Sequence, residues 1–335
     1  MNNTNNTDLH RTFLSVVFIT EGIVIAPTIF GNLLLIYCIK RYRALHARSY
    51  ILIGSLAVSD LLFGLLFLPY DMLTVAFPIM RENQLTCLLR AVLLYGLVGA
   101  SNTNIFIISL ERHIALTYPL WHLKLSWRWL AGSIAVAWGM PLLMAVLPIL
   151  GWNSWNVNLK CVNEWKDAIS SSFLMLWSYS NVSLLVISCI LFFKVVFTTF
   201  SFLNNKSFQK GQFGVQRQLS VTRRTSIEKT KVLILIVGFF VLCWGPYCLL
   251  IIVKPFIQDQ SEQSKQLDIA EKYCGLLAVC NCTLNWVIYG LKNKNIRHTF
   301  KLTLCGRRSR HENGLDHIST ISTKQEQFSQ LSCVK

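Results

Sequence analysis

Seven long apolar segments alternate with short polar stretches along the chain. They lie near residues 13–39, 50–76, 86–118, 128–150, 171–200, 230–254 and 271–290. Each is long enough for a helix that crosses a bilayer, which needs about 20 apolar residues. Polar residues, Pro and Gly interrupt most of the segments, and packed helices tolerate them better than a helix that faces only lipid. The pattern predicts an all-α membrane protein, a seven-transmembrane helix bundle over residues 13–291.

A shorter amphipathic segment follows the seventh span, over residues 292–305. Within it Ile296, Phe300 and Leu304 recur every four positions, with basic residues between them. This spacing places the three apolar side chains on one face of a helix. It predicts a short helix on the membrane surface. Residues 1–12 are expected to form an N-terminal tail and residues 306–335 a disordered tail.

Composition agrees with a membrane protein, and the distribution of charge predicts its orientation. Of the 335 residues 53% are hydrophobic and 14% are charged, whereas soluble domains carry about 25% charged residues. Most Lys and Arg residues, which give a net charge of +16, lie in the loops on one side and in the C-terminal tail. The positive-inside rule places that side in the cytosol and the N-terminus outside. Because topology explains the basic clusters, nucleic acid is not an expected partner.

Short motifs occur in six of the seven spans, in a fixed order. They are Gly31-Asn32, SLAVSD ending at Asp60, Glu111-Arg112-His113, Trp138, Cys243-Trp244-Gly245-Pro246 and Asn285-Trp286-Val287-Ile288-Tyr289. Together they resemble the rhodopsin-like (class A) G-protein-coupled receptors, nearest to the adenosine, cannabinoid and lysolipid receptors. The resemblance covers about residues 13–305. It implies a plasma-membrane receptor that binds an extracellular ligand and activates a heterotrimeric G protein, with arrestin and receptor kinases as further partners.

Two other classes of protein are weighed against a receptor. A multi-span transporter is expected to show internal repeats with matching helix breaks, and no repeat is visible in this sequence. An enzyme is expected to carry a recognisable catalytic motif, but the chain lacks G-x-S-x-G, a P-loop and a cluster of metal-binding side chains. We therefore expect a receptor, with a transporter or channel as the alternative, and no enzymatic activity.

Asp60 is a carboxylate in the middle of an apolar span, where burial costs at least ~2.5–3.5 kcal/mol on insertion scales. In the family that the chain resembles, this position binds a sodium ion with one serine of the third span and two asparagines of the seventh. The counterparts are Ser101, Asn281 and Asn285, with Trp244 nearby. Hard oxygen ligands suit a hard cation. The alternative is a neutral Asp60 hydrogen-bonded to the same asparagines.

The resemblance also implies an activation site at the cytosolic end of the third span. There Arg112 pairs with its neighbour Glu111 at rest and turns to the G protein in the active state. Glu228, near the base of the sixth span, is a second possible partner of Arg112. The simpler alternative is that Arg112 is an interfacial anchor. Further activation residues implied by the resemblance are Trp244, Asn285 and Tyr289.

Three kinds of covalent feature are expected. The resemblance implies a disulfide between Cys87, which precedes Arg112 by 25 residues, and Cys161 in the second outer loop, both facing an oxidising compartment. Cys305 follows the amphipathic segment and is a candidate palmitoylation site. Asn2 and Asn5 each begin an Asn-x-Thr sequon, which suits an N-terminus outside the cell. The first residues do not resemble a cleaved signal peptide.

Several residues exclude particular classes of ligand. Leu94 replaces the aspartate that binds an ammonium group in aminergic receptors, and Val279 replaces the retinal-binding lysine of opsins. Glu21, Glu164 and Cys87 match adenosine receptors, but Ile251 replaces their purine-binding asparagine and Val279 their histidine. Lysolipid and cannabinoid receptors share the LPILGWN phrase at 147–153 but generally lack the cysteine that Cys87 supplies. Adenosine, a lipid or other small apolar ligand, and a peptide or unknown ligand all stay open.

The predicted ligand pocket lies among the outer halves of the spans. Its candidate lining residues are Asp71, Tyr95, Glu164, Trp177, Trp244, Tyr247 and Ile251. Asp71 and Glu164 are the expected polar contacts, with a solvated rim charge as the alternative for either. Two departures from the family concern activation: the fifth span has no mid-helix Pro and has Phe192 for its inner Tyr, and Trp286 replaces the Pro of the seventh span. The usual bend of the seventh span, which Pro favours, is therefore in doubt.

Overall fold

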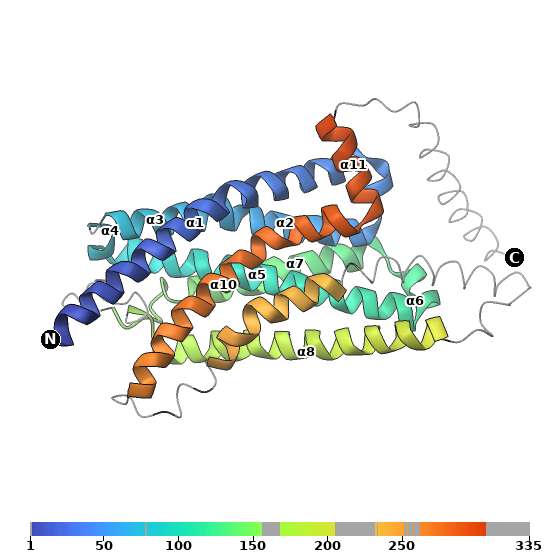
Figure 1. Cartoon of the computed structure of the whole chain (residues 1–335). Coiled ribbons are helices and arrows are strands. Elements are labelled where there is room, and N and C mark those ends of the chain that lie inside the picture. The colour runs from blue at the N-terminus through green and yellow to red at the C-terminus, as the bar shows by residue number, and fades with distance from the viewer. Residues whose placement is uncertain are drawn as a thin grey trace, which may run out of the picture.

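The computed structural model describes residues 2–77, 79–155, 168–204, 232, 234–250, 253, 257 and 262–305. Helices dominate this part of the chain (Figure 1), with one isolated antiparallel bridge between Asn153 and Ile169. The long helices are α1 Asn2–Arg41, α2 Arg48–Leu62, α3 Leu68–Ala76, α5 Gln84–Thr117, α7 Trp127–Val146, α8 Ser171–Asn204 and α10 Glu262–Lys292. The short elements are η1 Arg43–Leu45, η2 Phe63–Phe67, α4 Ile79–Glu82, α6 Pro119–Lys124 and α11 Lys294–Cys305.

The predicted spans agree with these helices. Six described helices are long and apolar enough to cross a membrane, and a shorter apolar helix, Ile234–Leu250, corresponds to the predicted sixth span. We call it the sixth-span helix. The six are Ser15–Arg41, Arg48–Ala76, Gln84–Thr117, Trp127–Val146, Ser171–Ser201 and Ile269–Lys292. The all-α membrane bundle is thereby confirmed.

One predicted boundary differs from the structure. The fourth span was expected to reach residue 150, but α7 ends at Val146 and the chain turns through Gly151, whose φ of 118° a residue with a Cβ rarely adopts. In the predicted N-terminal tail, the chain is already helical from Asn2, where α1 begins. The apolar run that crosses the membrane starts only at Ser15, so hydropathy located the span and not the start of the helix.

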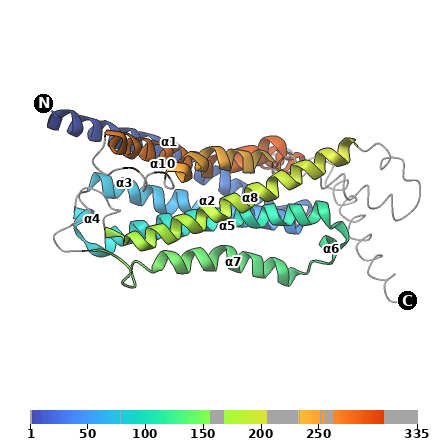
Figure 2. The ribbon, with the colours of Figure 1, turned by 90° about the horizontal axis from the view of Figure 1, so that it is seen from below.

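Small residues on α5 allow α7 to pack closely against it. A Cβ added at Gly99 would lie 2.8 Å from the Cβ of Pro141, and one at Gly96 would lie 3.1 Å from Leu142. Such small positions are typical of packed membrane helices. Figure 2 shows α7 running along α5 on the side away from α1 and α10. α5 also contacts α2 and α8, so its side chains face several helices of the bundle.

The second span contains a π-helical segment, η2, between α2 and α3. Pro69 follows two residues after its end, and a Pro inside a helix clashes with the carbonyl four residues earlier. A π-type turn takes up the extra residue while the span continues. Asp60 lies just before this segment and Asp71 just after it. The irregularity thus separates the two acidic side chains of the second span, at different depths of the bundle.

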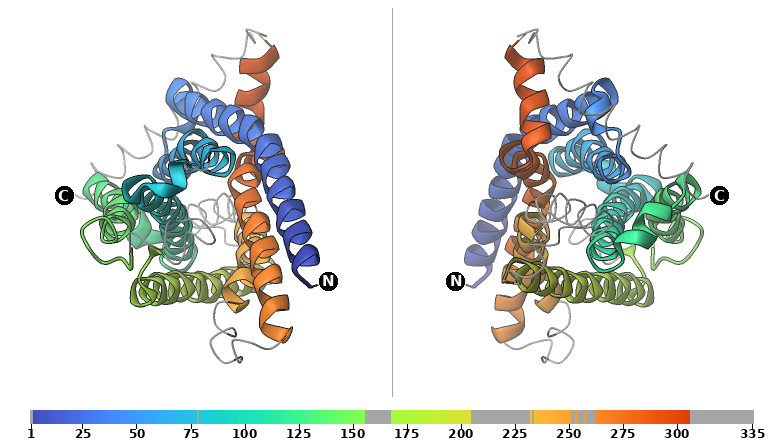
Figure 3. Two further views of the ribbon diagram at one scale, coloured as in Figure 1. Left: turned by 90° about the vertical axis from the view of Figure 1, so that its left-hand side faces the viewer. Right: turned by 90° about the vertical axis from the view of Figure 1, so that its right-hand side faces the viewer.

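The amphipathic segment forms α11, which lies across the long axis of the bundle in Figure 1 and stands off its side in the end-on views of Figure 3. Asn293 ends the run of α10, and its side-chain oxygen accepts from the backbone N–H groups of Asn295 and Ile296 at 3.1 and 3.2 Å. This is a helix cap. The predicted short helix is present, with Ile296 and Phe300 buried against the bundle and Leu304 exposed.

Candidate functional site

Polar side chains gather at three depths of the bundle. We name the two ends by their buried charged residues, the Arg112 end and the Asp71 end. At the Arg112 end, Arg112 donates from Nε to Glu111 Oε2 at 2.5 Å and from Nη2 to Glu111 Oε1 at 2.7 Å. Both side chains are buried. A buried pair of this kind is held by charge and by two hydrogen bonds. The predicted pairing of Arg112 with Glu111 is present in the structure.

The same carboxylate has two further partners, which sequence reasoning missed. His122 of α6 lies with Nε2 2.8 Å from Glu111 Oε1, and Ser49 of α2 donates to that oxygen at 3.3 Å. Ser49 also accepts from Arg112. Arg48, the preceding residue, donates to the backbone oxygens of His122 and Leu125. These contacts fasten α6 to α2, and no helical spacing in the sequence links His122 to Glu111.

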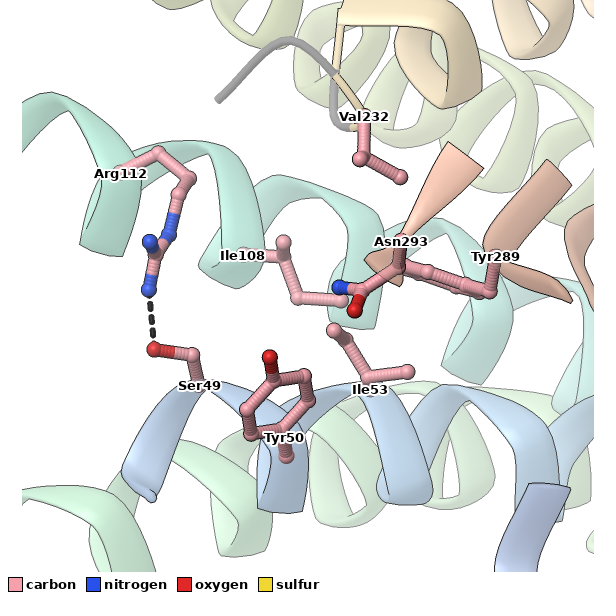
Figure 4. A pocket seen from close by; sticks show the side chains of 8 residues that line it. All are labelled: Ser49, Tyr50, Ile53, Ile108, Arg112, Val232, Tyr289 and Asn293. Atoms are coloured by element: carbon pink, nitrogen blue, oxygen red, sulfur yellow. Dashed lines mark hydrogen bonds between the residues drawn. The ribbon is translucent and has the colours of Figure 1, made fainter. Parts of the chain in front are cut away.

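A small cavity opens beside this cluster. Figure 4 shows the Arg112 guanidinium, the Ser49 hydroxyl and the Asn293 amide around it, together with apolar side chains. The Tyr289 hydroxyl on its wall is buried and has no hydrogen-bond partner among the described residues. Glu228, the second predicted partner of Arg112, lies outside those residues. The lining residues are Ser49, Tyr50, Ile53, Ile108, Arg112, Val232, Tyr289 and Asn293.

The middle of the bundle holds Asp60, which is fully buried. Its Oδ1 accepts from the Ser101 hydroxyl at 3.1 Å and its Oδ2 from Asn285 Nδ2 at 2.9 Å. Asn281 is also buried, and its side-chain oxygen has no hydrogen-bond partner in the described part of the chain. Carboxylate, hydroxyl and amide oxygens form the donor set that a hard cation takes. Three of the four predicted ligand residues thus lie together, with Ser101 and Asn285 both hydrogen-bonded to Asp60.

The predicted aromatic residue Trp244 lies between the two apolar cores, packing against both. Its ring meets Phe240 at a centroid distance of 6.4 Å and Tyr247 at 6.0 Å. It therefore connects the predicted activation residues to the predicted pocket.

Trp286, the residue that replaces the family's Pro, packs on the bare backbone of Gly31. A Cβ added at Gly31 would lie 2.0 Å from the Trp286 ring. The neighbouring Asn32 donates to the backbone oxygen of Cys282 at 3.2 Å, and Thr28 and Thr283 hydroxyls lie 2.5 Å apart. α10 continues as one helix through this region. At this position a side chain stands where the family has a Pro, and the helical hydrogen bonding of α10 continues past it.

At the Asp71 end, the buried Asp71 forms an ion pair with Arg90 of α5. Glu21 of α1, also buried, lies beside Asp71. Asp71 is therefore not a solvated rim charge. Sequence reasoning missed Arg90, although it is an isolated cation near the start of an apolar span, and such residues are functional candidates by default. It also missed Glu271 of α10, which is buried at the same end.

Aromatic side chains line the same end of α5 and α8. Tyr95 and Trp177 have ring centroids 4.6 Å apart, and Phe173 lies 5.6 Å from Tyr95. All three are buried. The structure thus brings together three of the predicted ligand residues, Asp71, Tyr95 and Trp177, within one region. Glu164 and Ile251 lie outside the described residues.

The predicted covalent sites are only partly described. Cys87 is buried and disulfide-bonded, whereas Cys161 lies outside the described residues, so the pairing of the two stays a prediction. Cys305 is an exposed free thiol at the end of α11. Asn2 and Asn5 lie in the first turns of α1. Their modification remains an expectation.

Comparison with known proteins places this geometry in a family. The family model described as 7 transmembrane receptor (rhodopsin family) matches residues 31–289. Lysophosphatidic acid receptor 1 of Ovis aries is 29% identical over 289 residues, which cover 85% of this chain and 69% of the relative. Lysophosphatidic acid receptor 1-A of Xenopus laevis is 29% identical and lysophosphatidic acid receptor 1 of Homo sapiens 28%, each covering 85% of this chain and 74% of the relative. The chain belongs to the rhodopsin family of seven-transmembrane receptors, G-protein-coupled receptors of the plasma membrane that are not enzymes.

Proposed function

We propose that this receptor responds to a lysophospholipid-like ligand, with one anionic phosphate and one long apolar chain. The observation that carries the proposal is Arg90, a cation of α5 that pairs with Asp71 at the end of the bundle where Tyr95, Phe173 and Trp177 are buried. Guanidinium binds phosphate through paired hydrogen bonds as it binds carboxylate. A phosphate that takes the place of the Asp71 carboxylate would therefore bind the same fork.

The surroundings of Arg90 suit the apolar part of such a ligand. Tyr95, Phe173 and Trp177 form a buried aromatic surface farther along α5 and α8. Burial of an acyl chain against such a surface contributes about 0.8 kcal/mol for each CH₂ group removed from water. The named activity of the relatives points the same way. Adenosine, the competing ligand, lacks both a phosphate and an acyl chain.

The test compares three ligands on cells that express the receptor, with G-protein activation as the readout. Lysophosphatidic acid is expected to activate it, while a monoacylglycerol with the same chain and adenosine are expected to be inactive. Arg90→Gln should lower the potency of lysophosphatidic acid about 10- to 100-fold, because hydrogen bonds to charged groups contribute about 1.5–3 kcal/mol.

Two variants serve as controls for charge. Arg90→Lys keeps the cation but not the fork, so its loss should be smaller than that of Arg90→Gln. Lys272→Gln removes a different basic residue of α10 and should leave potency unchanged. A response to adenosine alone, or equal potency of Arg90→Gln and the native receptor, would reject the lysophospholipid assignment.

We further propose that the Arg112 end faces the cytosol, where the cavity beside Arg112 receives the G protein, and that the N-terminus is outside. The unequal placement of basic residues supports this orientation. Arrestin and receptor kinases are proposed to act on the same side.

Sodium is proposed as an allosteric ligand held by Asp60, Ser101, Asn281 and Asn285, in support of which the Asn281 oxygen is buried and unpaired among the described residues. A bound cation would supply positive charge beside the Asp60 carboxylate. The covalent features, a Cys87–Cys161 disulfide, glycans at Asn2 and Asn5 and a palmitoyl group on Cys305, are proposed on sequence position. The exposure of Cys305 beside α11 is consistent with acylation at the membrane surface.

A further inference from the structure

Two asparagine side chains join α5 to α8 inside the membrane. Asn102 donates from Nδ2 to Asn181 Oδ1 at 2.8 Å. Asn181 donates from its own Nδ2 to the backbone oxygen of Trp177, one turn earlier on α8, also at 2.8 Å. Both residues lie well within the apolar spans Gln84–Thr117 and Ser171–Ser201. An amide at that depth finds partners on neighbouring helices, because lipid offers none. We call this pair the asparagine clasp.

The clasp leaves one polar atom unsatisfied. The side-chain oxygen of Asn102 is buried and has no hydrogen-bond partner among the residues that the structure describes. Turning the Asn102 amide over does not help, because its oxygen would then face the Asn181 oxygen while the Asn181 NH₂ group is engaged by Trp177. An unpaired buried acceptor raises the free energy of the state that contains it. The clasp therefore joins the two helices but leaves one buried acceptor unpaired, which reduces its net stabilisation.

Neighbouring polar residues of α5 behave differently. Thr103 and Ser109 are buried too, but their hydroxyls donate to the backbone oxygens of Gly99 and Ile105 on the same helix. Such bonds satisfy the hydroxyl without reaching another helix. Asn102 is thus set apart from them by reaching α8, and Thr103 offers a matched control.

The clasp lies between two regions already described. Trp177, whose carbonyl holds Asn181, contacts Tyr95 at the Asp71 end. Ser101, which precedes Asn102, donates to Asp60 in the middle of the bundle. α8 contains no Pro over its 34 residues. It therefore keeps the backbone N–H donor that a Pro, usual in the fifth span of the family, would remove. At this depth of the bundle, the hydrogen bond between Asn102 and Asn181 is a polar contact that joins α8 to α5.

We propose that Asn102 and Asn181 are positioning residues that hold α8 against α5 in the resting arrangement, and that activation separates them. The structure shows the clasp together with the Arg112–Glu111 pair of the resting arrangement. Because the Asn102 oxygen is unpaired, the clasp contributes less than a fully hydrogen-bonded pair would. A ligand that binds the separated arrangement better would then shift the equilibrium toward it. The inference rests on the receptor function proposed above.

The test is a double-mutant cycle in purified receptor reconstituted in lipid nanodiscs, without ligand or G protein. Asn102→Val, Asn181→Val and the double variant are each combined with Val232→Cys, because Val232 is buried and lines the cavity beside Arg112. The rate of alkylation at that position, quantified by peptide mass spectrometry, reports opening of the cavity. Each single variant should raise the rate about 3-fold, and at most about 20-fold, the range set by interhelical hydrogen bonds in membranes.

The double variant should open no more than the single variants, because either one already breaks the clasp. Thr103→Val should leave the rate unchanged, and so should Ser183→Ala, which removes the Asn181-Val-Ser sequon without touching the clasp. Where the Val variants fail to fold, Asn102→Ser and Asn181→Ser keep a small polar group that is too short to bridge the helices.

Three results would overturn the proposal: rates equal to that of the native clasp, additive effects in the cycle, or an equal rise in Thr103→Val. Lower thermal stability with unchanged alkylation would mean that the clasp is only structural, and it counts against the proposal. The test of the clasp and the test of the receptor function can fail separately. If the chain does not activate a G protein, no nucleotide exchange will be seen when G protein is added. The alkylation rates are measured without G protein and do not depend on that result.

Discussion

Arg112 is the residue on which coupling to the G protein is expected to depend most. Its guanidinium is buried against Glu111 and Ser49 at the edge of the cavity, so it provides a fixed cationic fork that few other side chains could replace. Arg112→Ala should abolish nucleotide exchange by the G protein at unchanged surface expression. The measurement is exchange in membranes that contain equal amounts of each receptor, and native exchange by the variant would contradict the assignment.

Asp60 gives a second prediction at the scale of single residues. If sodium prefers the resting arrangement, added sodium should weaken agonist binding, since a ligand stabilises the state that it binds better. Asp60→Asn should abolish this effect because it removes the carboxylate that Ser101 and Asn285 surround. Binding is measured in NaCl and in KCl at equal ionic strength. Equal effects of the two salts, or a sodium effect that persists in Asp60→Asn, would exclude the site.

The contacts of single residues could be predicted where the residues belong to a known family motif. They could not be predicted where only the fold brings the residues together. Asp60, Ser101 and Asn285 were inferred as a group and do lie together. His122 meets Glu111 only because the fold places α6 against the start of α2, and no helical periodicity connects the two residues. Arg90 was a different kind of omission, because an isolated charge in an apolar span is visible in the sequence itself.

At the scale of helices, the contact between Gly31 of α1 and Trp286 of α10 makes a sharp prediction. Gly31→Ala should lower the thermal stability of the solubilised receptor, because the new Cβ would lie 2.0 Å from the Trp286 ring. Overpacking of this kind costs typically about 1–3 kcal/mol. Adding Trp286→Ala to Gly31→Ala should recover much of the loss.

A matched control for this substitution lies on the same helix. A Cβ at Gly22 would meet only the end of the Met72 side chain, at 3.9 Å, so Gly22→Ala should leave stability unchanged or raise it slightly. Unfolding can be followed with a thiol-reactive dye, since Cys243 and Cys282 are buried free thiols. An equal loss of stability in both Gly variants would show that the Trp286 contact does not decide the effect.

At the scale of the whole molecule, hydropathy was sufficient to predict the spans, because a bilayer imposes its thickness on every helix that crosses it. It was insufficient for features that depend on neighbours, such as the start of α1 at Asn2 or the irregular η2 before Pro69. Helix continuity through Trp286 likewise depends on the room that Gly31 leaves. Interhelical contacts such as that between Asn102 and Asn181 follow from packing alone.

The unbroken α10 has a mechanical consequence. Were α10 to tilt as one rod about the contact between Trp286 and Gly31, its two arms would be unequal: Glu271 lies fifteen residues to one side, about 22 Å at the usual helical rise, while Tyr289 lies three residues to the other, about 4.5 Å. A displacement of Glu271 would then be reduced about fivefold at Tyr289 and reversed in direction. A tilt of α10 alone would therefore move the Arg112 end little, and a larger displacement there would require other helices to move.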